Sequence, residues 1–310
     1  NDFQMRSEFP TTDEEAFQSN STRYYEEAHI QACRRTCKDP VFVGDLRGYS
    51  ATGREALRDL RFVDDGNGQL AVWAQPENTP GEKITHRYLV TVDIGGKHYR
   101  SDWSVISVFD RLMLTDPNGA LERVATYTAH IDHDLLAWKA AQIATWYGNA
   151  LLVIESNTLE TRDRKQDDTL FEGDHFYTVL NEIADVYPNL YARNTPPENS
   201  RETVALKYGW HTNKRTKYLA YDRSRAAIRD GEYIERDRRC ADEMAWLETK
   251  PNGSLGAIDG RHDDIIDTTA IAIYISSEEM PLPRHIPTPS APPRNRSSHT
   301  THTPGGMATL

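Results

Sequence analysis

The chain has 310 residues, of which 38% are hydrophobic and 27% charged, and its formal net charge is -11. This is the composition of an ordinary globular protein, and its apolar runs are far too short to span a bilayer. Three cysteines argue against a disulfide framework, and the negative charge is unusual for a protein that binds nucleic acid.

Residues 1–81 come before the most regular part of the pattern. Residues 1–40 are polar and helical in character, with Thr12 as a helix cap and Glu15 three places on. Residues 41–81 mix short strand-like pieces with turn signals such as Pro80-Gly81. We expect this part of the chain to be a linker or a small subdomain.

The pattern becomes regular near residue 87 and alternates strands with helices. Residues 281–310 are rich in Pro, Ser, Thr and His and are predicted to be a disordered tail. In chain order the predicted elements are strands over 88–92, 105–109 and 121–129, a helix over 135–146, a strand over 150–154, a helix over 176–186, a strand over 190–192, and helices over 213–229 and 263–276.

This order of elements predicts an RNase H-like α/β fold. Short turns make the first three strands antiparallel, and helical crossovers make the later strands parallel, in a mixed sheet flanked by helices. In this topology the first strand is central and the fourth pairs with it. Asp93 and Glu155 then end on neighbouring strands and point to the same edge of the sheet.

Acidic residues stand at three positions where such a fold can bring them together. Asp93 and Glu155 each end an apolar run, and Asp263-Asp264 opens an apolar helical pattern. Two of the three positions have a simpler interpretation. Asp93 lies just before Gly95-Gly96 and can be a turn residue, and Asp263 and Asp264 can cap a helix. Glu155 is harder to explain in this way, because a carboxylate after a buried strand needs a partner.

Together the acidic clusters predict a metal-dependent nuclease. Hard divalent cations prefer oxygen ligands, and two such ions can clamp a phosphodiester for attack by water. The candidate catalytic and metal-binding residues are Asp93, Glu155, Asp263 and Asp264, with Mg²⁺ or Mn²⁺ as a pair of ions. Asp267, His262 and Lys217 are candidates for contacting a ligand or a phosphate.

The sequence lacks the motifs of several other enzyme classes. It contains no Walker A motif, no Gly-x-Ser-x-Gly elbow and no His-Glu-x-x-His. It is therefore not expected to hydrolyse ATP by itself. Basic residues are locally dense at 162–165, 214–217 and 223–229, where each run fits either a solvated face or a DNA contact.

The chain resembles the C-terminal nuclease part of the large terminase subunit of tailed bacteriophages. Residues 8–18 resemble the segment where the packaging ATPase ends and the linker begins. The other matching segments are Val-Asp-Ile-Gly-Gly at 92–96, Val-Ile-Glu-Ser-Asn at 153–157, Gly-Trp-His-Thr at 209–212 followed by Lys214 and Lys217, Asp-Glu-Met at 242–244, and His-Asp-Asp-Ile-Ile-Asp at 262–267.

The resemblance implies an endonuclease that cuts concatemeric double-stranded viral DNA during genome packaging. It implies residues 1–81 as the end of the ATPase domain with its linker, and residues 82–280 as the nuclease domain. The chain begins with Asn1, and we expect an ATPase half either to precede it or to be encoded elsewhere. The implied partners are double-stranded DNA, the small terminase subunit and the portal protein, on which the chain would form an oligomer. The implied location is the host cytoplasm, without a membrane.

Two other readings stay open. A Holliday-junction resolvase would use the same chemistry on another DNA, although a resolvase needs no segment like the one before residue 87. Alternatively, the acidic cluster is a non-catalytic docking surface of a packaging complex, which would not need paired ions. Transposases and integrases normally carry a DNA-reading domain, and none is recognisable in the sequence.

Overall fold

The computed structural model describes residues 23–77, 82–95, 102–157, 175–195 and 205–287. The elements are, in chain order, α3 (Glu27–Thr36), β1 (Phe42–Arg47), η1 (Arg54–Leu57), β2 (Arg61–Asp64), β3 (Leu70–Val72), β4 (Glu82–Thr85), β5 (Tyr88–Asp93), β6 (Ser104–Asp110), η2 (Leu112–Thr115), β7 (Leu121–Ala129), α4 (His133–Trp146), β8 (Leu151–Asn157), α5 (His175–Ile183), β9 (Ala192–Thr195), β10 (Ala205–Tyr208), β11 (Trp210–Thr212), α6 (Lys214–Asp230), β12 (Tyr233–Ile234), α7 (Arg238–Trp246), β13 (Leu247–Thr249), β14 (Leu255–Ala257), α8 (Asp264–Glu278) and β15 (Arg284–Pro287).

The central sheet has the strand order β11-β8-β5-β6-β7-β3-β1-β2. Strands β5, β6 and β7 are antiparallel, β8 is parallel to β5, and β11 is parallel to β8. Numbered from β5, the first five strands of this order are the 5-4-1-2-3 arrangement of the RNase H-like fold. The predicted fold class is confirmed, with β5 at the centre and the fourth strand beside it.

Three strands of the N-terminal part extend this same sheet. β3 pairs with β7, and β1 lies between β3 and β2, all antiparallel. The segment from 42 to 72, predicted to be a linker or small subdomain, is thus hydrogen-bonded to the sheet through β7. The predicted division at residue 81 stays a prediction, and residues 78–81 lie outside the described residues.

The fifth strand of the RNase H-like core is interrupted, which corrects the predicted strand over 190–192. Leu190 forms only an isolated parallel bridge with Leu152. The regular pairing with β8 is made further along, by β11, whose Trp210 lies opposite Glu155. Between these two contacts the chain forms the antiparallel pair β9–β10. The strand that completes the sheet is therefore β11, which lies about twenty residues after the predicted position.

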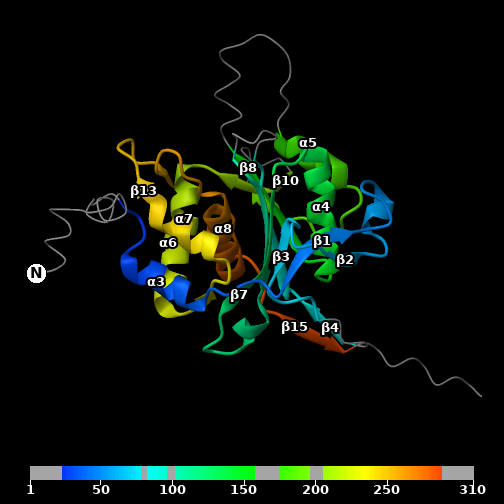
Figure 1. Cartoon of the computed structure of the whole chain (residues 1–310), viewed down its shortest axis with the longest axis horizontal. Helices are drawn as coiled ribbons and strands as arrows, with labels where there is room; N and C mark the ends of the chain where they lie inside the picture. Colours follow the sequence, from blue (N-terminus) through cyan, green and yellow to red (C-terminus); the bar gives the residue numbers. More distant parts are fainter. Residues whose placement is uncertain (1–22, 78–81, 96–101, 158–174, 196–204, 288–310) are drawn as a thin grey trace, which may run out of the picture.

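Helices cover both faces of the sheet and divide the core into two clusters. Helices α3, α6, α7 and α8 lie on one face, and α4 and α5 lie on the other (Figure 1). Leu89 and Val153 belong to the cluster on the α8 face, whereas Val90 and Leu152 belong to the cluster on the α4 face. Because side chains alternate along a strand, Asp93 and Glu155 share the parity of Leu89 and Val153 and point toward α8.

The predicted C-terminal tail begins later than expected. Residues Arg284–Pro287 form β15, which pairs antiparallel with Glu82–Thr85 of β4. The prediction of disorder from residue 281 is wrong for these four residues, because the pairing partner lies about two hundred positions earlier and leaves no local signal. The rest of the tail lies outside the described residues.

Candidate metal centre

Two buried carboxylates lie at the same edge of the sheet, on β5 and β8. Asp93 and Glu155 are only 8% and 5% exposed. In the parallel register Val92 lies opposite Ile154, so Asp93 and Glu155 occupy the next pair of positions. Oε2 of Glu155 is buried without a hydrogen-bond partner in the described part of the chain. A buried oxygen of this kind costs free energy unless something binds it.

The N-terminus of α8 brings further carboxylates to this edge. Asp263 occupies the N-cap position, but its side chain makes no capping hydrogen bond. Oε2 of Glu243, on α7, instead accepts a hydrogen bond from the backbone N–H of Ile266 at 2.8 Å. Asp264 is buried and its Oδ2 accepts from the backbone N–H of Trp103 at 3.0 Å. The side chains of the Asp263-Asp264 pair are therefore free of the capping role that the sequence left open.

Lys217, on α6, pairs with two of the acidic residues of α8. Its Nζ lies 2.9 Å from Oδ2 of Asp267 and 3.3 Å from Oδ2 of Asp263. Asp267 also accepts a hydrogen bond from the hydroxyl of Tyr221 at 2.5 Å. Burial opposes the charge of Lys217, but Asp267 and Asp263 raise its pKa above the ordinary value. Asp263 and Asp267 are thus compensated by a cation.

Three other carboxylates are compensated less well, and their pKa values show it. Burial raises the pKa of Asp93 well above its ordinary value, and Glu155 and Asp264 raise it further. Burial and then Asp267 raise the pKa of Glu155 to about 7, although Thr212 and Lys217 oppose the shift. Burial raises the pKa of Asp264 to about 8, against the hydrogen bond from Trp103. The site holds more negative charge than its surroundings neutralise.

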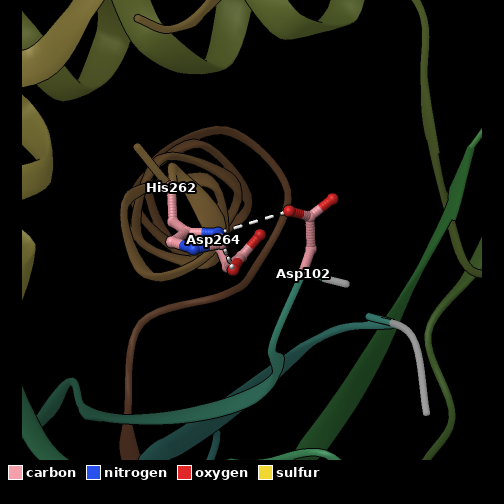
Figure 2. Close-up of side chains that lie close together, drawn as sticks. All are labelled: Asp102, His262 and Asp264. Carbon is pink, nitrogen blue, oxygen red and sulfur yellow. Dashed lines mark hydrogen bonds and ion pairs between the residues drawn. The ribbon is translucent and has the colours of Figure 1, made fainter. Parts of the chain in front are cut away.

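Asp102 and His262 adjoin this cluster and approach Asp264. One possible ligand atom from each of Asp102, His262 and Asp264 lies within 4.8 Å of the others. Nδ1 of His262 lies 3.3 Å from Oδ1 of Asp102 and 3.7 Å from Oδ2 of Asp264 (Figure 2). Asp93 and Glu155 do not belong to this tight set. The sequence analysis missed Asp102, which stands outside the apolar patterns that indicated the other acidic residues.

The donor set fits hard divalent cations. Its members are mainly carboxylate oxygens, the ligands that suit Mg²⁺ and Mn²⁺, with one imidazole, that of His262, at the exposed side. A bound cation would give the unpartnered oxygen of Glu155 a ligand bond. It would also lower the raised pKa of Asp93 by stabilising the ionised carboxylate. Asp93, Glu155 and Asp264 are not ion-paired to Lys217, so their oxygens could accept a cation.

No protein-family model matches the chain, and no curated protein matches it in sequence. Solved structures are similar to it. The large terminase nuclease from thermophilic phage G20c, with bound magnesium, has a TM-score of 0.43 and 17% identity, over 76% of this chain and 97% of that one. The large terminase nuclease domain of Thermus phage P74-26 has a TM-score of 0.42 and 15% identity, over 81% and 97%. The manganese-soaked, inhibitor-bound terminase nuclease domain of human cytomegalovirus has a TM-score of 0.38 and 12% identity, over 63% and 85%.

All three are terminase nucleases. No helix in the described part of the chain is both long and apolar enough to cross a membrane.

The arginines of the basic run at 223–229 pair with acidic neighbours. Arg223 pairs with Glu232 at 2.8 Å, and Arg229 pairs with Asp230 at 2.7 Å. Lys217 belongs to the site itself, as described above. The run at 162–165 lies outside the described residues. For residues 223–229 the simpler interpretation, a solvated and ion-paired face, accounts for the contacts.

Proposed function

We propose that this chain is a divalent-metal-dependent endonuclease and the nuclease part of a phage large terminase. The observation that carries the proposal is the cluster of Asp93, Glu155 and Asp264. These carboxylates come from two neighbouring strands and one helix, are buried, and have raised pKa values. Burying so much uncompensated acid is costly for a fold, and a functional site is where that cost is normally found.

Asp93, Glu155 and Asp264 would hold two Mg²⁺ or Mn²⁺ ions, and Asp263 is the alternative to Asp264. Such ions activate water at neutral pH and stabilise the charge that develops on a phosphodiester. The chain itself fixes the positions of the ligands. The parallel register sets Asp93 beside Glu155, and the N–H of Trp103 orients Asp264. Lys217 and Tyr221 hydrogen-bond Asp267 beside them and oppose the rise that burial causes in its pKa.

The biological setting in this proposal rests on the resemblance of the sequence motifs. The substrate would be concatemeric double-stranded viral DNA, cut in the host cytoplasm during packaging. The small terminase subunit and the portal protein would be partners, with the chain acting as an oligomer on the portal. The net charge of -11 opposes DNA binding, and each bound metal ion would offset part of this negative charge at the proposed site.

The test is cleavage of supercoiled plasmid by the purified chain with Mg²⁺, Mn²⁺ or EDTA. We expect nicking and linearisation that require the metal and that are lost in Asp93→Asn and Glu155→Gln. Asp39→Asn is the matched control, since Asp39 is an exposed carboxylate outside the cluster. A folded wild-type chain that binds no metal and cuts no DNA would contradict the proposal and favour the docking reading.

A four-way DNA junction serves as a parallel substrate for the resolvase alternative. Because the chemistry is the same, only the relative rates on the two substrates separate the readings. We expect the linear or supercoiled duplex to be cut at least as fast as the junction. Selective cutting at the junction would move the assignment from terminase to resolvase.

A further inference from the structure

Trp103 is an exposed aromatic residue beside the carboxylate cluster, and the proposed function gives its side chain no role. All six tryptophans of the chain lie in its described part, and Trp103, which is 37% exposed, is the most exposed of them. Its backbone N–H donates to Asp264, so the Cα atom that carries the side chain is bonded to an atom fixed against the cluster. A single exposed aromatic side chain is ordinary on a protein surface, but the position of this one beside the carboxylate cluster places it where a ligand of the cluster would lie.

The backbone of Trp103 is held closely against the end of β5. A Cβ atom built on Gly95 would lie 2.3 Å from the carbonyl carbon of Trp103, a distance that no side chain tolerates. Glycine at position 95 therefore allows the two backbones to approach. The N–H of Gly95 also donates to the hydroxyl of Ser104 at 3.2 Å. Trp103 is thus attached both to the strand that carries Asp93 and to the helix that carries Asp264.

The indole ring is also held from one side. Ser104 lies opposite Ala129 in the β6–β7 ladder, so Trp103 and His130 take the next pair of positions. Their rings stack with centroids 4.0 Å apart and an interplanar angle of 27°. A ring supported on one face and exposed elsewhere is already ordered, which lowers the entropic cost of a further stacking contact.

We infer that the indole of Trp103 is a contact for a DNA nucleotide next to the scissile phosphate. The inference rests on the proposed function. Lys217, the cation next to the cluster, is committed to Asp263 and Asp267. Aromatic stacking gives an acidic protein affinity for a nucleotide that does not depend on phosphate charge. The hydrogen bond to Asp264 keeps the backbone of Trp103 beside a residue that is proposed to hold the metal.

The test compares Trp103→Leu, which keeps an apolar side chain, with Trp103→Phe, which keeps an aromatic ring. Both are made in the full chain carrying Asp93→Asn, and binding of a short fluorescein-labelled DNA duplex is titrated at several salt concentrations. Met113→Ala is the matched control, because Met113 is also exposed and apolar but lies in η2, after the opposite end of β6. Plasmid cleavage by the parent chain is measured in parallel.

We expect Trp103→Leu to weaken DNA binding about fivefold or more, and Trp103→Phe to weaken it less, because stacking on one base contributes about 1–3 kcal/mol. The slope of log affinity against log salt should not change, because no phosphate contact is lost. Met113→Ala should bind as the parent does. In the cleaving background, KM for DNA should rise at an unchanged metal requirement.

Three outcomes would overturn the inference. Equal effects of Leu and Phe would assign Trp103 to apolar packing. A raised metal requirement with unchanged DNA binding would make it only a positioning residue for Asp264. If the parent chain cuts no DNA with any metal, the proposed function fails, and the assignment of a nucleotide beside a scissile phosphate fails with it.

Discussion

Helix α8 passes two buried polar clusters that handle charge in opposite ways. At its N-terminus, Asp93, Glu155 and Asp264 are buried and have raised pKa values, and one oxygen of Glu155 is unpartnered. One turn further along, Thr268 and Thr269 contact a cluster around Arg123 and Glu235, whose side chains are both fully buried. Both clusters are buried, but the charge of Glu235 is paired with Arg123, whereas Asp93, Glu155 and Asp264 have no ion pair with an arginine or lysine in the described part of the chain.

The Arg123 cluster satisfies its hydrogen-bonding groups internally. Arg123 donates to Oε1 of Glu235 at 2.7 Å, to the hydroxyl of Ser107 at 2.8 Å and to the hydroxyls of Thr126 and Thr269. Glu235 also accepts from the hydroxyl of Tyr233 at 2.6 Å. A buried ion pair completed in this way needs no ligand and is a structural feature.

The comparison shows that burial of charge does not by itself mark a functional site. What distinguishes the N-terminal cluster is charge that the protein leaves uncompensated. The Arg123 cluster should therefore govern stability, and the carboxylate cluster should govern activity at some cost in stability. Substitutions in the two clusters should separate these two properties.

The largest effect is expected from Asp93→Asn. It should reduce DNA cleavage roughly 10³-fold or more, because bound ions contribute several kcal/mol to phosphodiester hydrolysis. The stability of the metal-free protein should not fall, since the change removes repulsion from Glu155 and Asp264. Plasmid cleavage and thermal unfolding measure the two properties. If the Asn variant is unstable but its folded fraction still cleaves DNA, Asp93 serves stability and not activity, which contradicts the prediction.

Arg123→Met should reduce the stability of the fold, whereas Asp93→Asn should reduce DNA cleavage. It leaves Glu235 buried and unpaired, which is expected to destabilise the fold by about 3–5 kcal/mol. Urea unfolding measures the loss, and the double variant Arg123→Met, Glu235→Gln should recover part of it, because the unpaired charge is gone. A loss below about 1 kcal/mol would show that the buried pair is not the structural feature described here.

The pH dependence of stability should follow the carboxylate cluster. Glu155 has a pKa of about 7 in the folded protein against an ordinary 4.5, so between these values the folded state binds more protons than the unfolded state. Its contribution is therefore complete below pH 4.5 and is lost as the pH rises to 7. We expect a loss of about 3 kcal/mol for the metal-free protein.

Divalent metal should reverse this loss. At a pH above 7, Mn²⁺ should stabilise the wild-type protein more than it does near pH 5, because it binds the ionised carboxylates. Thermal unfolding across pH, with and without Mn²⁺, measures the effect, and Glu155→Gln should flatten the metal-free profile. Stability that rises between pH 5 and 7 without metal would contradict the electrostatic account of the cluster.

The sequence predicted the part of this site that depends on strand order. Asp93 and Glu155 each end an apolar run, and once β8 is placed beside β5 their neighbourhood follows from the register. The strands over 121–129 and near 88–93 were predicted closely for the same reason, since buried central strands carry a strong apolar signal.

The rest depended on contacts between distant residues. Asp102 reaches His262 across 160 positions, and Glu243 caps α8 from another helix. The extension of the sheet by β1, β2 and β3 and the interruption of the fifth strand by β9 and β10 are likewise non-local. Such pairings have no local composition signal, because polar residues are compatible with any exposed turn until the fold brings their partners close.

Lys217→Gln should test the cation that pairs with Asp263 and Asp267 beside the carboxylate cluster. Removing it leaves Asp267 buried beside Asp263 with only Tyr221 as a donor. We expect a loss of about 1–2 kcal/mol in the metal-free protein, less than for Arg123 because Lys217 is partly exposed. Adding Asp267→Asn should restore most of it. Urea unfolding of the two single variants and the double variant measures the coupling between Lys217 and Asp267.

The smallest effect is expected from Asp102→Asn, compared with Asp264→Asn in the same ligand group. The side chain of Asp102 is 75% exposed, whereas that of Asp264 is 8% exposed and tied to Trp103. An exposed carboxylate is screened by water, so its loss should raise the metal concentration needed for half-maximal cleavage by less than about tenfold. Asp264→Asn should instead abolish most activity at any metal concentration. Equal effects of the two substitutions on cleavage would show that the role of a carboxylate at this edge does not depend on its burial. Uncompensated buried charge would then not explain why this cluster differs from the Arg123 cluster.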